Sequence, residues 1–263
     1  MVDFSKMSKI NQSSILANKC LVIIPTYNEV DSIESLLRQL AGQNFKILIV
    51  DDNSPDGTAE FVKKLSLPGV ELLNRPRKDG LGAAYKAAIK FALSQDWQFQ
   101  YIVSMDGDGS HQVSDLMKML ESLKQHPEAS LVLGSRWISD GGIRNWSGFR
   151  IFLSKAGTRY ARWALKLPVN DLTGGFRIYP REALKRIDLD QITSNGYCYQ
   201  IEMAFAIKHL NQKIVEHPIT FIEREAGRSK MSLKVVIEAI WRVSILGLGL
   251  RLRPNADKLH YVK

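Results

Sequence analysis

Short apolar runs alternate with amphipathic stretches through the first half of the chain. The runs with the composition of buried strands span residues 20–24, 45–50, 70–73, 101–105 and 130–133. Between them apolar residues recur with helical spacing, as Ile33, Leu36 and Leu37 do. Because parallel strands need crossover connections, the alternation predicts an α/β fold with a single, Rossmann-like, mostly parallel sheet and flanking helices.

The alternation loosens beyond Gly134. Apolar positions over residues 149–167, including Phe149, Phe152 and Trp163, predict a helix whose apolar face packs in the core while basic residues cover the rest. The other elements predicted here are a glycine-led turn into a short strand at 173–179, a helix at 197–210 and an extended segment at 214–222.

The last apolar segment, residues 232–250, carries charges at four-residue intervals, and its longest uncharged run is only residues 243–250. A bilayer span needs about 18 apolar residues without charges, so we expect no membrane crossing. An amphipathic helix lying on a membrane or docked on a partner fits this pattern. Packing on its own domain fits it equally well.

Length and composition favour one principal domain. A chain of 263 residues with 45% hydrophobic residues can bury a sizeable core. We expect a loosely ordered tail over residues 1–19, an α/β domain over 20–230 and a C-terminal amphipathic segment over 231–263. Cys20 and Cys198 form no metal-ligand or redox pattern, which indicates a reducing compartment.

Positive charge is concentrated in one segment. The formal net charge is +9, and residues 136–166 contain seven Lys or Arg against the single acid Asp140. Such a segment favours a polyanionic partner, either nucleic acid, anionic lipid or a phosphorylated substrate. A solvated helix face is the alternative interpretation.

Two carboxylates follow the predicted strand at 101–105. Asp106 and Asp108 lie one residue apart on a glycine-rich turn, and Mg²⁺ or Mn²⁺ typically takes one or two carboxylates and completes its shell with water and substrate phosphates. A calcium loop starting at Asp106 would need glycine at position six and glutamate at position twelve, where this chain has His111 and Met117. The pair therefore predicts a metal and diphosphate site.

Two other strand ends carry polar groups, and ligands bind at the carboxyl ends of such strands. Residues 25–29, Pro-Thr-Tyr-Asn-Glu, offer an aromatic ring and a carboxylate, and residues 51–58 include Asp52, an acceptor suited to a base or ribose. Residues 80–85 nearly match the dinucleotide fingerprint but have tyrosine in place of its third glycine, so we interpret them as a turn that opens a helix.

Candidate phosphate ligands lie further along the chain. They are Arg136, Arg224, Arg228 and Lys230, and the last three belong to a glycine-bearing loop over residues 223–230 that could close over a substrate. Each alone would more often be a surface charge, so their significance depends on their being together.

The motifs occur in an informative order. They are Pro25-Thr-Tyr-Asn-Glu, Asp51-Asp-Asn-Ser-Pro-Asp-Gly-Thr, Asp106-x-Asp, Ser110-His, Gly134-Ser-Arg, Asp171-Leu-Thr-Gly-Gly-Phe-Arg, Gly196-Tyr and Arg224-x-x-Gly-x-Ser-Lys. From about residue 21 to about residue 230 the chain resembles dolichol-phosphate (polyprenyl-phosphate) mannose synthases, inverting glycosyltransferases of family 2. The resemblance implies a GT-A fold followed by a C-terminal amphipathic helix.

The resemblance also implies roles for individual positions. The implied base and ribose ligands are Pro25, Tyr27, Glu29, Val50 and Asp52. The implied ligands of the ribose, the metal and the diphosphate are Asp106, Gly107 and Asp108. Of these, the two acids would bind the metal. The residues implied to approach the phosphates and the sugar are Arg136, Arg224 and Lys230. Asp108, Arg136 and Arg224 are the catalytic candidates. The family often has alanine at 107 and leucine at 109, so the glycines here predict a looser turn.

The implied reaction transfers mannose from GDP-mannose to dolichyl or polyprenyl phosphate with Mg²⁺ or Mn²⁺. UDP-glucose or another sugar nucleotide is the alternative donor. From a different class, a basic nucleic-acid-binding module would instead require stacking aromatics and no metal; we expect no nucleic acid partner.

We further expect peripheral association with the cytosolic face of a membrane, either endoplasmic reticulum or bacterial inner membrane, supplemented by a small membrane subunit or self-association. The local charge leads us to expect Arg150, Lys155 and Arg159 to receive the lipid phosphate. Trp146 and Trp163 suit a membrane interface.

Overall fold

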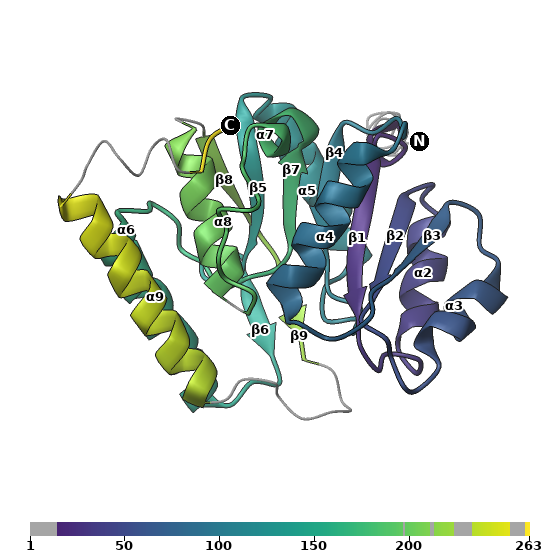
Figure 1. Cartoon of the computed structure of the whole chain (residues 1–263), viewed down its shortest axis with the longest axis horizontal. Coiled ribbons are helices and arrows are strands. Elements are labelled where there is room, and N and C mark those ends of the chain that lie inside the picture. Colours follow the sequence, from purple (N-terminus) through teal and green to yellow (C-terminus); the bar gives the residue numbers. More distant parts are fainter. Residues whose placement is uncertain (1–14, 197, 211–212, 224–232, 253–260) are drawn as a thin grey trace, which may run out of the picture.

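A central sheet of seven strands organises the molecule (Figure 1). A computed structural model describes residues 15–196, 198–210, 213–223, 233–252 and 261–263. The sheet has the order β3-β2-β1-β4-β7-β5-β8. Its strands are β1 Cys20–Thr26, β2 Lys46–Asp51, β3 Val70–Asn74, β4 Tyr101–Ser104, β5 Ala129–Ser135, β7 Arg177–Pro180 and β8 Lys213–Pro218. The five strands predicted in the first half are confirmed, with ends displaced by at most two residues.

Helices cover both faces of the sheet. They are α2 Ile33–Ala41, α3 Thr58–Leu65, α4 Leu81–Ser94, α5 Val113–Gln125, α6 Gly148–Leu165, α7 Arg181–Lys185, α8 Cys198–His209 and α9 Leu233–Leu252. Alternate residues of β1 point to opposite faces: Val22 packs in the core under α2 and α5, whereas Leu21 packs in the core under α4 and α8. Both faces are therefore buried, as expected for a mainly parallel sheet.

Two strand features were not predicted. β7 runs antiparallel between β4 and β5, with Val103 opposite Ile178. A second, two-stranded sheet pairs β6, Gly142–Arg144, with β9, Thr220–Ile222, in parallel. The three residues of β6 form too short a segment to show a period, and strand direction depends on the tertiary path.

The predicted core face of α6 is only partly confirmed: Ala164 of that face is buried, but its largest side chains are not. Phe149, Phe152 and Trp163 are 75%, 67% and 64% exposed, and smaller side chains such as Thr158 and Ala161 are buried instead. α9 packs along α6 on the side that carries Tyr160 and Ala164 (Figure 1).

α9 lies close along α6. A Cβ on Gly247 would lie 2.9 Å from the Ala164 carbonyl oxygen, so glycine is needed at this crossing. Tyr160 and Ser244 share a hydrogen bond of 2.6 Å between their hydroxyl oxygens. Packing on its own chain is therefore observed for α9, while Trp241 and Leu248 on its other side are exposed. No helix in the described ranges has both the length and the apolar character to cross a membrane.

Candidate active site

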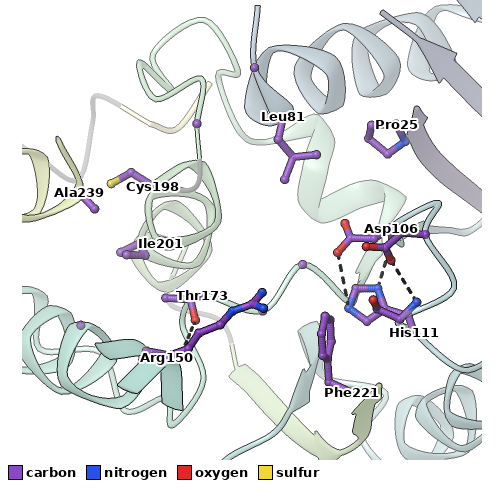
Figure 2. A pocket seen from close by; sticks show the side chains of 18 of the residues that line it. Pro25, Leu81, Asp106, His111, Arg150, Thr173, Cys198, Ile201, Phe221 and Ala239 are labelled. Carbon is purple, nitrogen blue, oxygen red and sulfur yellow. Dashed lines mark hydrogen bonds and ion pairs between the residues drawn. The ribbon is translucent and has the colours of Figure 1, made fainter. Parts of the chain in front are cut away.

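A cavity of about 770 Å³ lies at the carboxyl ends of the parallel strands. Figure 2 shows Asp106 and His111 on one side, Arg150 and Thr173 near the centre, and Ile201 and other apolar residues of α8 and α9 on the far side. The strand-end residues predicted from the sequence therefore meet at one place, as the topology of an open α/β sheet requires.

The Asp106 turn is held by short-range hydrogen bonds. The backbone N–H of Asp106 donates to His111 Nδ1 at 3.1 Å, and the N–H of Ser110 donates to Asp108 Oδ1 at 3.0 Å. A Cβ on Gly107 would lie 3.2 Å from Ile24 Cγ2, so the turn is pressed against β1 there. Both carboxylates border the cavity.

His111, the second residue of the Ser110-His motif, is a site residue to which sequence reasoning gave no role. Its ring is buried, stacks on Phe176 with centroids 4.7 Å apart, and has Nε2 3.8 Å from Asp106 Oδ2. Burial lowers the pKa of His111, although the charges of Asp106 and Asp108 oppose the shift. The sequence signal for this residue was its place in that motif, directly after the acid pair.

The nucleotide end contains most of the predicted donor ligands. Pro25, Tyr27, Glu29 and Asp52 border the cavity together with Gly107. Val50 does not reach it; its side chain lies in the core between β2 and α4.

Asp52 and Tyr27 each have a basic neighbour from the segment after β3. Arg75 Nη1 lies 2.5 Å from Asp52 Oδ1, and Lys78 Nζ lies 3.7 Å from the Tyr27 ring centroid. Burial raises the pKa of Asp52, and the Arg75 charge reduces that rise. Arg75 and Lys78 were not among the predicted ligands, although their segment directly follows β3.

Arg136 borders the cavity but is already bound to a buried acid. Its Nε and Nη2 donate to the two Asp171 oxygens at 2.6 and 2.7 Å, and Nη2 also donates to Thr173 at 2.9 Å. Burial opposes ionisation of Asp171, but the Arg136 charge and hydrogen bonds outweigh it and hold the pKa below its ordinary value. This pair fixes the 171–175 turn against the end of β5.

Arg150 reaches the centre of the cavity from the first turn of α6. Its guanidinium lies 3.9 Å from the Trp146 ring centroid and pairs with Glu223. The indole N–H of Trp146 and the Nε of Arg150 are buried and have no hydrogen-bond acceptor among the described residues. Trp146, which we expected to suit a membrane interface, lies in the cavity wall.

Lys155 and Arg159, predicted beside Arg150 as phosphate ligands, are exposed on α6 and do not border the cavity. Arg224 and Lys230, predicted as ligands, lie outside the described residues, as does Arg228.

An apolar passage continues from Arg150 between three helices. Its walls are Leu153, Ala156, Gly157 and Tyr160 of α6, Cys198 and Ile201 of α8, and Ala239, Ile240 and Val243 of α9. Sequence reasoning treated residues 231–263 as a separate segment and did not place α9 in the site. Nothing in the local pattern signals that these three helices share a cavity.

A mostly parallel sheet with paired acids beside a cavity at its carboxyl edge is the arrangement expected of a GT-A glycosyltransferase. Residues 21–188 match the family described as glycosyl transferase family 2, and the chain belongs to that family. It is an α/β enzyme of the glycosyltransferase class.

Two curated relatives cover most of the chain. An undecaprenyl-phosphate mannosyltransferase of Micrococcus luteus is 43% identical over 89% of this chain and 96% of its own length. A polyprenol monophosphomannose synthase of Mycolicibacterium smegmatis is 40% identical over 89% of each.

A solved structure supports the fold. Glucosyl-3-phosphoglycerate synthase of Mycobacterium tuberculosis, in complex with Mn²⁺, UDP and glucosyl-3-phosphoglycerate, aligns with a TM-score of 0.61 over 92% of this chain and 83% of its own. At 18% identity the similarity extends to the fold alone.

Proposed function

We propose that this enzyme transfers mannose from GDP-mannose to the phosphate of a polyprenyl or dolichyl lipid, with inversion at the anomeric carbon. The observation that supports this most directly is the single cavity, which joins an acid pair at the nucleotide end to a cationic centre and an apolar passage. The names of the two curated relatives support the same acceptor and sugar.

The nucleotide end suits a nucleoside diphosphate. Tyr27 offers a ring face, while the Asp52 carboxylate and Glu29 offer hydrogen-bond acceptors at the ends of β2 and β1. A carboxylate beside the base is the expected partner for donor groups of guanine. Asp106 and Asp108 then lie where the diphosphate would reach the cavity centre.

The acid pair fits a divalent cation, Mg²⁺ or Mn²⁺. Such cations take one or two carboxylates and complete their shell with phosphate oxygens and water. Both carboxylates border the cavity, and no atom lies within 4 Å of where a Gly109 Cβ would stand, so the turn is open there. When bound, the cation would stabilise negative charge on the departing diphosphate. Asp106 and Asp108 would hold it.

The cationic centre suits the acceptor phosphate. Arg150 presents a guanidinium beside Trp146 and Thr173, and guanidinium groups bind phosphate through paired hydrogen bonds. A phosphate oxygen is already anionic near neutral pH, so no side chain has to remove a proton before it attacks. Attack from the Arg150 side on a sugar held at Asp108 would be opposite to the leaving group, which gives inversion.

The passage between α6, α8 and α9 suits the first isoprene units of the lipid. The outward side chains of α6 and α9, including Phe152, Trp163, Trp241 and Leu248, are exposed and apolar. They would contact the membrane from which the acceptor enters, placing the enzyme peripherally on the cytosolic face of a membrane. A small membrane subunit or a second copy would add to this attachment.

A donor and acceptor panel with the purified full chain tests the proposal. GDP-mannose, UDP-glucose and GDP-glucose would each be offered with a short polyprenyl phosphate and Mn²⁺, and the lipid product identified by mass spectrometry with anomeric assignment by NMR. We expect β-linked mannosyl lipid from GDP-mannose at a rate at least about tenfold above the others. Preferred use of another donor would refute the donor assignment, and no transfer to any lipid phosphate would refute the acceptor.

A further inference from the structure

His111 faces Asp106 with both of its ring nitrogens (Figure 2). The backbone N–H of Asp106 donates to Nδ1 at 3.1 Å, so this nitrogen carries no proton. The proton of the neutral ring is therefore on Nε2, which lies 3.8 Å from Asp106 Oδ2. This distance exceeds that of a hydrogen bond, and a small rotation of the carboxylate would close it. One ring thus meets both the backbone and the side chain of Asp106.

The imidazole is held in place by its neighbours. It is 3% exposed, stacks on Phe176 with centroids 4.7 Å apart, and packs at nearly a right angle to the Phe221 ring with centroids 5.4 Å apart. The N–H of Ile222 donates to the Ser110 carbonyl at 3.1 Å, which ties the turn to β9. A side chain fixed by packing on two sides is able to hold a neighbouring group in one orientation.

A divalent cation at the acid pair would need the Asp106 carboxylate in a defined orientation. Carboxylates that bind a metal are themselves usually hydrogen-bonded by a neighbouring group, and loss of that group typically lowers metal affinity by roughly 10- to 100-fold. A neutral imidazole suits this place because it donates a proton without adding positive charge. A lysine or arginine at the same place would repel the cation.

We propose that His111 is a positioning residue whose Nε2–H holds Oδ2 of Asp106 and so orients that carboxylate for Mg²⁺ or Mn²⁺. The inference rests on the proposed function, in which Asp106 and Asp108 hold the cation. His111 does not bind the cation itself in this arrangement, because Nε2 carries the proton and Nδ1 is occupied by the backbone N–H. It acts on the nucleotide only through the cation, so nucleotide binding without cation does not require it.

Two substitutions separate the two contacts of the ring. His111→Asn places an amide oxygen near the position of Nδ1, where it can accept the Asp106 N–H, but it has no donor that reaches Oδ2. His111→Gln places an amide nitrogen near the position of Nε2, where it can donate to Oδ2, and loses the backbone contact. If His111 orients the carboxylate, His111→Gln should rescue cation binding. If it only holds the turn, His111→Asn should.

Binding of Mn²⁺ to the GDP-saturated full chain tests the proposal, with free Mn²⁺ measured by its EPR signal. We expect His111→Asn to bind Mn²⁺ at least about tenfold more weakly than the wild type, and His111→Gln within about threefold of it. The affinity for GDP without cation, measured by calorimetry, should stay within about twofold in both variants. In the control His217→Asn, the lost ring has its Nδ1 2.6 Å from Ser122 Oγ, away from the cavity, and both affinities should be unchanged.

The outcomes are distinct. Equal Mn²⁺ affinity in the wild type and His111→Asn overturns the inference, and so does tighter binding by His111→Asn than by His111→Gln. An equal loss of GDP affinity without cation also overturns it, since the whole nucleotide end would then be disturbed. In these cases the wild type still binds Mn²⁺ and GDP, so the proposed function stands. A wild type that binds no Mn²⁺ in the presence of GDP overturns both the inference and the proposed metal site.

Phe221→Leu covers the case in which thermal unfolding shows that His111→Asn does not fold. This change keeps both ring nitrogens of His111 and loosens the packing that holds the ring, so Mn²⁺ should bind about threefold more weakly. An unchanged Mn²⁺ affinity in Phe221→Leu would then overturn the positioning role.

Discussion

The donor end and the acceptor end of the cavity differ in where their residues come from. Donor-end residues follow individual strands, so each short motif is local in sequence, and the sheet brings the motifs together. Acceptor-end residues come from α6, α8 and α9, which are far apart in the chain, and they are mainly apolar. Polar strand ends can therefore be recognised in a sequence, whereas a passage between helices depends on how those helices pack.

The two ends are joined by the Arg136–Asp171 pair. Arg136 follows β5, Asp171 precedes the turn that carries Thr173, and both side chains are buried. A buried pair of this kind fixes one element against another. We call the Arg136–Asp171 pair the joint. Substitutions at the donor end, at the joint and at the acceptor end should therefore change different quantities, namely kcat, the free energy of unfolding and the KM for the lipid phosphate.

The largest effect is expected at the donor end. Asp108→Asn should lower kcat about a thousandfold, because it removes charge where the diphosphate leaves. Affinity for GDP without divalent cation should stay within about twofold of the wild type. Steady-state kinetics and calorimetry measure the two quantities. Asp190→Asn, an exposed acid paired with Lys90, is the matched control. Near wild-type turnover in Asp108→Asn would mean that this acid has no part in the chemistry.

At the joint, Asp171→Asn should reduce the free energy of unfolding by about 3 to 5 kcal/mol at pH 7, because it leaves the buried Arg136 charge unpaired. The folded-state pKa of Asp171 lies below its ordinary value of 3.8. Its ionised form therefore stabilises the folded state above pH 3.8, and this contribution is lost as the pH falls through the lower, folded-state pKa.

Urea denaturation between pH 3 and pH 7 tests the joint. The wild type should lose stability at the acid end of this range, and the loss should be smaller in Asp171→Asn, which has no carboxyl to protonate there. Equal stability of the two proteins at neutral pH would show that the pair does not hold the turn.

At the acceptor end, Arg150→Met should raise KM for the lipid phosphate about thirtyfold and leave KM for the sugar nucleotide within about twofold, since a charged hydrogen-bond donor to phosphate is lost. Arg159→Met, on the exposed side of the same helix, should change neither constant. A rise in the donor KM of similar size would place Arg150 at the nucleotide instead, and so break the division into two ends.

The smallest effect concerns the apolar passage. Gly157 borders it and has no atom within 4 Å of where a Cβ would lie, so Gly157→Leu can fill the passage without a clash at its first atom. We expect KM for an acceptor of ten or more isoprene units to rise about tenfold, and KM for isopentenyl phosphate less than about threefold.

Gly148→Leu is the control for the passage, because Gly148 is equally open, lies on the same helix and does not border the cavity. Leucine favours a helix more than glycine does, so neither change should lower helix stability. If chain length makes no difference to the Gly157→Leu effect, the lipid does not lie in this passage.

Several elements were predictable because their signal is local. The strands β1 to β5 and the helices between them follow from apolar periodicity, and the turn at residues 80–82 opens α4 as expected. Gly82 also has a role that no local pattern shows: a Cβ there would lie 2.6 Å from Tyr199 Cβ, so glycine lets α4 approach α8. The partly misplaced face of α6 has a similar cause, since large apolar residues such as Phe149 and Phe152 predicted the core but are exposed, and which side of the helix is covered depends on packing.

The sequence by itself determined the alternation of strands and helices, the acid pair after β4 and the polar ends of β1 and β2. These features persist because residues a few positions apart share one strand, one helix face or one turn. The tertiary structure alone decided that His111 stacks on Phe176, that Glu223 pairs with Arg150, and that three distant helices enclose an apolar passage. Those contacts depend on how whole elements pack, and packing joins residues whose spacing along the chain carries no period.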